Sequence, residues 1–191
     1  MAGSARRRLL EAGYACISRY GISKTTVEDV ARVAGMSRAT VYRYFPGGRE
    51  QLVREVISWE AGRFFARLAE AVSGAGSLAE QLEETVWFAR RAFLEHEVLQ
   101  KVLETEPELI LPQLTVESSR VLPFVRAFLA THVTRADLRA GLGVDEAADF
   151  LARLVLSYIA SPGSWDLSDR DQVRQLVATE LLAAVGPGPA G

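Results

Sequence analysis

One stretch of the chain, residues 25–45, combines more structural signals than any other and restricts the fold most. Thr25 or Thr26 can cap a helix, with an acidic residue three positions later as the capping-box partner. Gly35 ends that helix, because only glycine enters the left-handed conformation without steric cost. Ser37 can cap a second helix. The stretch therefore predicts two short helices joined by a tight turn.

Small and apolar residues within the stretch set how these helices can pack. Ala31 lies four residues before Gly35, and Val41 lies six residues after it. Val41 and Phe45 are four residues apart and therefore share the inner side of the second helix. These positions suit two helices that cross closely at a steep angle, which is the spacing of a helix-turn-helix motif.

The outer side of the second helix carries groups that recognise nucleic acid. Guanidinium forks, a methyl group and hydroxyls follow one another over two helical turns, in Arg38, Ala39, Thr40, Tyr42, Arg43 and Tyr44. Such groups can reach base edges and phosphates in a major groove. The alternative is an amphipathic helical pair whose polar face is merely solvated. A solvated face does not need two arginines and two tyrosines with no acid among them, so the pattern favours DNA binding.

Charge is distributed unevenly along the chain. The net charge is −2, but residues 1–57 hold 10 Lys and Arg against 5 Asp and Glu, and the other 134 residues hold 12 against 19. A basic first segment on an acidic remainder fits a nucleic-acid-binding head. Arg6, Arg7 and Arg8 allow two interpretations, a solvated terminus or an arm that touches phosphates or the minor groove.

The run from Leu9 to Leu52 resembles the DNA-binding domain of the tetracycline-repressor (TetR) family of transcriptional regulators. The resemblance covers about a quarter of the chain and rests on Ala12, Gly21, Thr25, Thr26, Val27, Val30, Ala31, Ala34, Gly35, Met36, Ser37, Thr40, Val41, Tyr42, Tyr44, Phe45, Arg49, Glu50 and Leu52. With it, we expect Thr25, Thr26, Ser37 and Arg49 to join the second helix in binding DNA. Residues 46–48 depart from the family pattern, which more often has a shorter link with a lysine. We expect Arg49 to take over that lysine's phosphate contact.

The rest of the chain has helical periodicity throughout and no convincing strand pattern. The predicted fold is all-α, with an N-terminal three-helix helix-turn-helix DNA-binding domain and a C-terminal helical ligand-binding and dimerisation domain. The predicted segments are the DNA-binding domain 1–48, the effector-binding and dimerisation domain 49–186 with its connecting helix 49–72, and a disordered tail 187–191. Later helices are predicted over 77–94, 95–104, 109–132 with possible kinks at Pro112 and Pro123, 145–160 capped by Asp145, and 168–185 capped by Ser168.

The resemblance implies an effector cavity inside the helical body. Such cavities are largely apolar with a few placed polar groups. The body is rich in aromatic residues, most of which would be plain core taken singly. The residues expected to bind the ligand are Trp87, Phe88, Arg91, Phe124, Phe128 and Phe150.

A homodimer is predicted through the last two long helices. The first, Asp145–Ala160, is apolar on nearly all sides, so one core cannot bury every face. The second, Ser168–Val185, carries a stripe at four-residue steps, Val173, Val177, Leu181 and Val185. Two such helices from each subunit would form a four-helix bundle, as the family also implies. The alternative is that both helices lie inside a monomer.

The sequence offers no pattern for catalysis. The two histidines lack a second ligand at metal spacing, and no phosphate-binding glycine loop or nucleophile elbow is present. We therefore expect neither an enzyme nor a cofactor. Cys16 lies on an apolar stripe and is expected to be a buried structural thiol. No signal peptide or membrane span is evident, so a cytoplasmic protein without a membrane partner is expected.

These observations together predict a dimeric DNA-binding transcriptional regulator that binds a near-palindromic operator. By resemblance, it would be a repressor that a small lipophilic effector releases from DNA. One alternative is a constitutive DNA-binding regulator with a filled core and no effector. Another, disfavoured by the motif, is a helical enzyme or ligand-binding protein.

Overall fold

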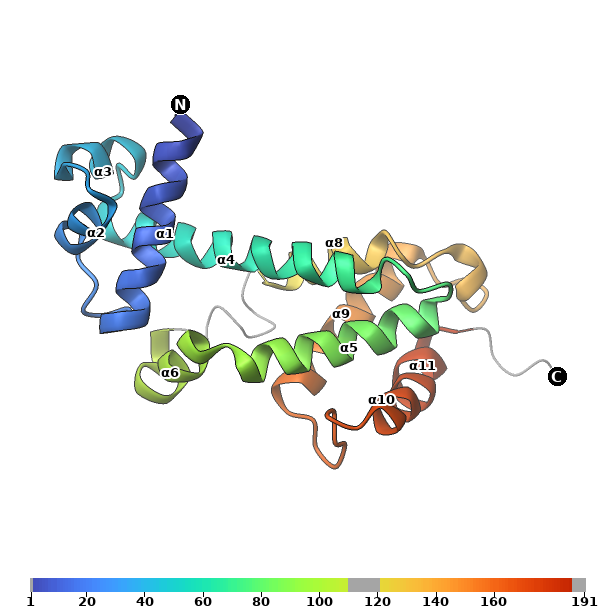
Figure 1. Ribbon diagram of the computed structural model, residues 1–191. Helices are drawn as coiled ribbons and strands as arrows, with labels where there is room; N and C mark the ends of the chain where they lie inside the picture. The colour runs from blue at the N-terminus through green and yellow to red at the C-terminus, as the bar shows by residue number, and fades with distance from the viewer. Residues whose placement is uncertain (1, 110–120, 187–191) are drawn as a thin grey trace. The chain divides into compact units, whose positions relative to one another are not determined.

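The computed structural model describes residues 2–109 and 121–186, and every regular element within them is helical (Figure 1). The predicted all-α fold is confirmed. None of these described helices combines the length and apolar character needed to cross a membrane. The predicted tail 187–191 lies outside the described residues, as does most of the first half of the helix predicted over 109–132.

Contacts divide the chain into two units, which we call the head and the body. The head consists of residues 1–64 and 97–111, and the body of residues 65–96 and 112–191. The helices of the head are α1 (Ala2–Tyr20), α2 (Val27–Ala34), α3 (Arg38–Tyr44), the first part of α4 (Gly48–Val72) and α6 (Glu97–Thr105). The body holds the end of α4, α5 (Leu78–Glu95), α8 (Val121–Ala130), η1 (Arg135–Asp137), α9 (Val144–Ala160), α10 (Arg170–Leu176), η2 (Val177–Leu182) and α11 (Ala183–Val185).

The predicted helix-turn-helix is confirmed in its local details. Thr26 caps α2, where its hydroxyl oxygen accepts from the Asp29 amide at 3.1 Å. Gly35 ends α2 in the left-handed conformation with φ 63°. Ser37 caps α3 and accepts from the Thr40 amide at 3.1 Å. Both ends of the turn are therefore fixed by the residues that the sequence indicated.

The head has its own apolar core beneath this motif. Val41 and Phe45 are fully buried, as predicted for the inner side of the second helix. They belong to a core that also contains Leu9, Ile17, Val30, Leu52 and Val56. Cys16 is a buried free thiol whose pKa is raised, first by burial and then by the Asp29 carboxylate.

The body is built around α5, α9 and the last helical stretch. One cluster buries residues from all of them, including Leu82 and Val86 of α5, Leu151 and Val155 of α9, and Leu176 of α10. Pro123 lies in the first turn of α8, where a missing amide costs no helical hydrogen bond. The last stretch passes from α10 through the wide π-helical turn η2 into α11.

Three expectations for the body need correction. The cap of α9 is Gly143, whose amide donates to Glu146 at 3.0 Å, and Asp145 lies inside the helix. The cap of α10 is Asp169, which accepts from the Asp171 amide, so the helix begins two residues after Ser168. The stripe predicted as a dimer seam, Val173, Val177, Leu181 and Val185, lies inside the body core with at most 2% of each residue exposed.

Candidate nucleic-acid interface

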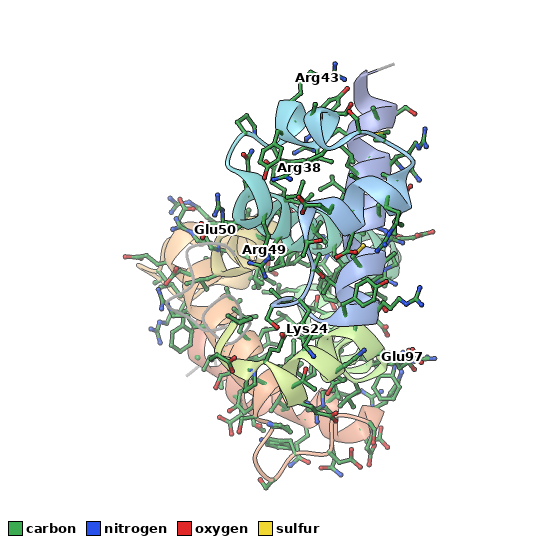
Figure 2. All side chains as sticks on the ribbon, turned by 90° about the vertical axis from the view of Figure 1, so that its left-hand side faces the viewer. Lys24, Arg38, Arg43, Arg49, Glu50 and Glu97 are labelled. Carbon is green, nitrogen blue, oxygen red and sulfur yellow. The ribbon has the colours of Figure 1, made fainter. Side chains whose placement is uncertain are left out.

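The outer side of α3 presents the side chains that the sequence proposed for DNA. Ser37, Arg38, Ala39, Tyr42 and Arg43 are exposed, while Thr40 and Tyr44 are half-buried. Figure 2 looks onto this face and shows Arg43 and Arg38 projecting from α3. The buried Val41 anchors the opposite side of the same helix. One face of a seven-residue helix is thus packed and the other is left to solvent.

Hydroxyl caps order the residues around the two helix N-termini. The Ser37 hydroxyl lies 2.9 Å from the Thr40 hydroxyl in addition to the amide that it caps. The Thr26 hydroxyl donates to the Asp29 carboxylate at 2.5 Å, and this hydrogen bond is the first cause that lowers the pKa of Asp29. Each cap is exposed and lies where a helix N-terminus offers amide groups to an anion.

Arg38 is held by neighbours on two helices. Its guanidinium pairs with Glu28 of α2 at 2.7 Å and lies 5.5 Å from the centre of the Tyr42 ring. The Tyr42 hydroxyl and then the Glu28 carboxylate raise the pKa of Arg38. Arg43 lies over the ring of the next residue, Tyr44, at 5.3 Å. Both guanidinium groups are therefore directed by an aromatic ring, and Arg38 also by an acid.

Two of the residues predicted to bind DNA are engaged inside the head. Thr25 is 1% exposed, and its hydroxyl donates to the Gly21 carbonyl at 2.6 Å. Arg49, at the start of α4, donates to the Thr25 carbonyl at 2.8 Å and to the Ile22 carbonyl at 2.5 Å. These contacts support the loop between α1 and α2, so the structure gives both residues a supporting position.

The three arginines near the N-terminus belong to α1. Arg8 donates to the Ala34 carbonyl of α2 at 2.7 Å, and Arg7 pairs with Glu11 at 2.8 Å. Arg6 forms an ion pair with Glu55 of α4. Arg8 therefore helps to close the C-terminal end of α2, and all three arginines are exposed.

In the body, the structure brings some of the proposed ligand-binding residues together. Phe124 stacks on Phe65 with ring centres 5.7 Å apart, and Phe128 lies 6.4 Å from Phe65. Trp87 packs on the body core with the Arg170 guanidinium 4.6 Å from its ring centre.

The other proposed body residues lie on α5 and α9. Arg91 is exposed and pairs with Glu95 at 2.7 Å, and Phe150 is 44% exposed on α9. Phe88 is half-buried on α5. Phe124 and Phe128 share an aromatic cluster with Phe65 and with His132, whose ring centre lies 4.5 Å from that of Phe128, and Phe124 is 46% exposed.

Sequence reasoning missed two polar groups inside the body. Among the described residues, the Gln81 Oε1 and Thr85 Oγ1 atoms are buried and have no hydrogen-bond partner, and they lie one helical turn apart on α5. Buried polar atoms are normally satisfied, so each such atom calls for an explanation, such as a water or another ligand. The available signal was a pair of polar residues four apart on a helix otherwise rich in buried apolar residues.

Two regions of the chain match families of known proteins. Residues 9–56 match the family described as bacterial regulatory proteins, tetR family. Residues 76–181, more than half of the chain, match the family described as bacterial tetracyclin repressor, C-terminal domain. The first match contains the helix-turn-helix of the head, and the second contains most of the body.

Curated relatives match over short segments. An uncharacterized HTH-type transcriptional regulator of Mycobacterium tuberculosis H37Rv is 33% identical over 69 residues, which is 36% of either chain. One from Mycobacterium bovis is 45% identical over 42 residues, or 22% of either chain. The chain thus spans about a third or less of the length of these relatives.

Solved structures match over nearly the whole chain. The TetR family repressor AlkX from Dietzia sp. strain DQ12-45-1b has a TM-score of 0.66 at 22% identity, over 94% of this chain and 96% of that one. The R. erythropolis repressor QsdR gives 0.63 at 20% identity over 100% of both chains. RolR in complex with resorcinol gives 0.62 at 19% identity, over 97% and 89%. At these identities the likeness concerns the fold.

Proposed function

Because the chain belongs to the tetR family of bacterial regulatory proteins, we propose that it regulates transcription by placing α3 in the major groove of operator DNA. Members of this family are DNA-binding regulators and not enzymes. The observation that carries the proposal is the outer face of α3, where Arg38, Tyr42 and Arg43 are exposed beside the capped N-terminus at Ser37. Arginine forks suit guanine edges and phosphates, and tyrosine hydroxyls suit phosphates.

The contacts that we assign follow the burial of each side chain. Thr26, Ser37, Arg38, Ala39, Thr40, Tyr42, Arg43 and Tyr44 would face DNA, because they surround the exposed side of α3 and the cap of α2. Thr25 and Arg49 would act from behind, by holding the loop that leads into α2.

A homodimer would place two heads on a near-palindromic operator, since a two-fold axis in the protein matches one in the DNA. The stripe first expected to form the dimer contact is buried in the body core, so we assign the contact to another surface of the body. Phe150, Leu154 and Tyr158 follow at four-residue steps along α9 beside its buried face. Phe150 is 44% exposed, so this line carries an aromatic ring that the single chain leaves to solvent. We therefore place the α9 part of the dimer contact on this line.

The regulator would act as a repressor that responds to a small, largely apolar effector bound in the body. The cluster of Phe65, Phe124 and Phe128 supports an apolar ligand, and the unpartnered oxygens of Gln81 and Thr85 support one with a hydrogen-bond donor. RolR, which has a similar fold, is described in complex with resorcinol, a small aromatic diol. Binding would favour a conformation with lower affinity for the operator.

Selection of DNA from a random duplex library on the purified full-length protein tests DNA reading. We expect enrichment of a near-palindromic duplex and a strong fall in its affinity as salt is raised. Arg38→Ala should lower the preference for one base pair in each half-site by about 1–3 kcal/mol, whereas Tyr42→Phe should weaken all sequences similarly. A library that shows no enrichment and a flat response to salt would contradict the proposal.

Effector response is tested separately with the selected duplex. A panel of small phenols, alkanes and fatty acids is titrated against the tryptophan fluorescence of the protein, with Trp87→Phe to assign the signal. A true effector weakens duplex binding, and the duplex weakens effector binding by the same factor. Ligands that bind without changing the affinity for DNA would leave a constitutive regulator.

A further inference from the structure

Helix α6 lies between body helices in the sequence but belongs to the head in space. Residues 97–111 group with residues 1–64, while α5 before them groups with the body. Figure 1 shows α6 beside the C-terminal end of α1. Two charged side chains, Lys101 and Glu106, join this segment to the end of α1 and to the loop after it.

Lys101 binds the C-terminal end of α1. Its ammonium group donates to the Ser18 carbonyl at 2.9 Å and lies 3.5 Å from the Arg19 carbonyl. The last carbonyls of a helix lack partners within it and carry the negative end of its dipole. A cation is therefore well matched to this position.

Glu106 binds the loop that follows α1. Its carboxylate accepts from the Ile22 amide at 2.6 Å and from the Ser23 amide at 3.0 Å, and also from the Ser23 hydroxyl. The side chain is largely buried, with 9% of the residue exposed. Gly21 adopts φ 87°, and a Cβ atom there would lie only 3.0 Å from the Glu106 carboxylate. The loop and the acid thus fit each other closely.

Arg49 binds the carbonyl groups of the same loop. It donates to Ile22 at 2.5 Å, to Ser23 at 3.1 Å and to Thr25 at 2.8 Å. Glu106 therefore takes the amide groups and Arg49 the carbonyl groups of one short loop. Charged partners form the stronger class of hydrogen bond, so this pair fixes the loop backbone.

The loop determines where the DNA-reading helices begin. It runs directly into Thr26, the cap of α2, and α2 supplies the Glu28 carboxylate that pairs with Arg38 of α3. We propose that Glu106, the residue directly after α6, is a positioning residue for DNA reading. This inference rests on the proposed DNA binding. It gives Glu106, which lies far from α3 in the sequence, a role in the DNA specificity of α3.

The carboxylate form of Glu106 is the one that the loop requires. Burial on its own raises the pKa of Glu106, but hydrogen bonds from the Ser23 hydroxyl and amide and from the Ile22 amide outweigh it. The pKa consequently lies below its ordinary value. An amide in place of the carboxylate would turn one acceptor into a donor that faces the loop amides.

The test compares full-length Glu106→Gln with Glu104→Gln, a matched change at an exposed acid on α6. Binding is measured to the duplex selected by the wild type and to a scrambled duplex of equal length. Hydrogen exchange is followed at residues 21–26, and helicity by circular dichroism. For Glu106→Gln we expect about tenfold weaker binding to the selected duplex, little change for the scrambled one, and faster exchange in the loop. Glu104→Gln should match the wild type in all measurements.

Each other outcome overturns a defined statement. Selected-duplex affinity within twofold of wild type, in a folded Glu106→Gln protein, overturns the positioning role. An equal loss on both duplexes also overturns it, because non-specific binding does not depend on how α3 is aligned. A wild type that selects no duplex overturns the proposed DNA reading itself. If Glu106→Gln folds poorly, Ser23→Ala removes one donor to the same carboxylate and must reproduce the selective loss on a smaller scale.

Discussion

The salt dependence of DNA binding should distinguish Arg43 from Arg49. Both were predicted from the sequence to contact DNA, and the structure places them in different surroundings. Arg43 lies exposed on α3 over the Tyr44 ring, whereas Arg49 donates to backbone carbonyls of the α1–α2 loop. Either residue could be named a phosphate contact from its charge and its place in the motif. Of the two, only Arg43 lies on the exposed side of α3 that we propose to face DNA.

The expected magnitude follows from counterion release. Each phosphate that a protein cation neutralises changes the slope of log affinity against log salt by about 0.9, so the two copies of Arg43 in the proposed dimer would contribute about 1.8. Over a fourfold rise in salt this slope corresponds to about a twelvefold loss of affinity. Arg43→Gln should therefore lose about twelvefold less affinity than the wild type between about 50 and 200 mM salt. Arg49→Gln should lower affinity at every salt concentration and leave the slope unchanged.

Fluorescence anisotropy with the selected duplex at five or more salt concentrations measures both slopes. Circular dichroism at the same concentrations controls for folding, because Arg49→Gln also removes hydrogen bonds within the head. A slope that falls equally for Arg43→Gln and Arg49→Gln would refute the reasoning, since Arg49 would then neutralise a phosphate in the complex. An unchanged slope for Arg43→Gln would remove this residue from the phosphate contacts.

Three further predictions concern the body and the loop. Phe150→Glu should give folded monomers in light scattering, because Phe150 is 44% exposed, while Leu181→Arg should unfold the body, because Leu181 is fully buried. Thr85→Val should leave the free energy of unfolding unchanged or raise it by about 1 kcal/mol, since the Thr85 hydroxyl is buried without a partner; a clear loss in denaturant melts would reveal a partner. The pKa of Glu106 is lowered in the fold, so its stabilisation is complete above its unfolded pKa and is lost as the pH falls through the folded value. The difference in unfolding free energy between wild type and Glu106→Gln should accordingly begin to shrink as the pH falls through about 4.3, the unfolded pKa of a glutamate, and shrink further at lower pH; a constant difference would contradict the carboxylate role.

Short-range signals in the sequence were sufficient for the helix-turn-helix. Thr26, Gly35 and Ser37 act within three or four residues of their own position, so residue type and spacing determine what they do. The same rule explains the two caps that were misplaced in the body. Gly143 has no side chain to mark it as a cap, and Asp169 stands beside Ser168, which is an equally suitable residue.

Periodicity identified apolar faces but not what covers them. Val177 and Leu181 repeat at the interval expected for either a core or a dimer seam, and only the fold shows that both lie inside one body. The contact of Glu106 with the α1–α2 loop could not be predicted from the sequence for a related reason. It meets Ile22 across 84 residues, and no local pattern distinguishes it from the exposed acids around it.

The ion pair between Glu28 and Arg38 gives the two arginines of α3 different chemistry. Near a phosphate, the Glu28 carboxylate would be repelled, so a phosphate bound to Arg38 would oppose its 2.7 Å contact with Glu28. At a guanine edge, Arg38 meets neutral acceptors and can keep Glu28 as a partner that fixes its direction. Arg43 lies over the Tyr44 ring, has no acid paired with it among the described residues, and gains most from a phosphate. The acid on α2 therefore favours Arg38 as the residue that reads sequence and Arg43 as the residue that supplies salt-dependent affinity.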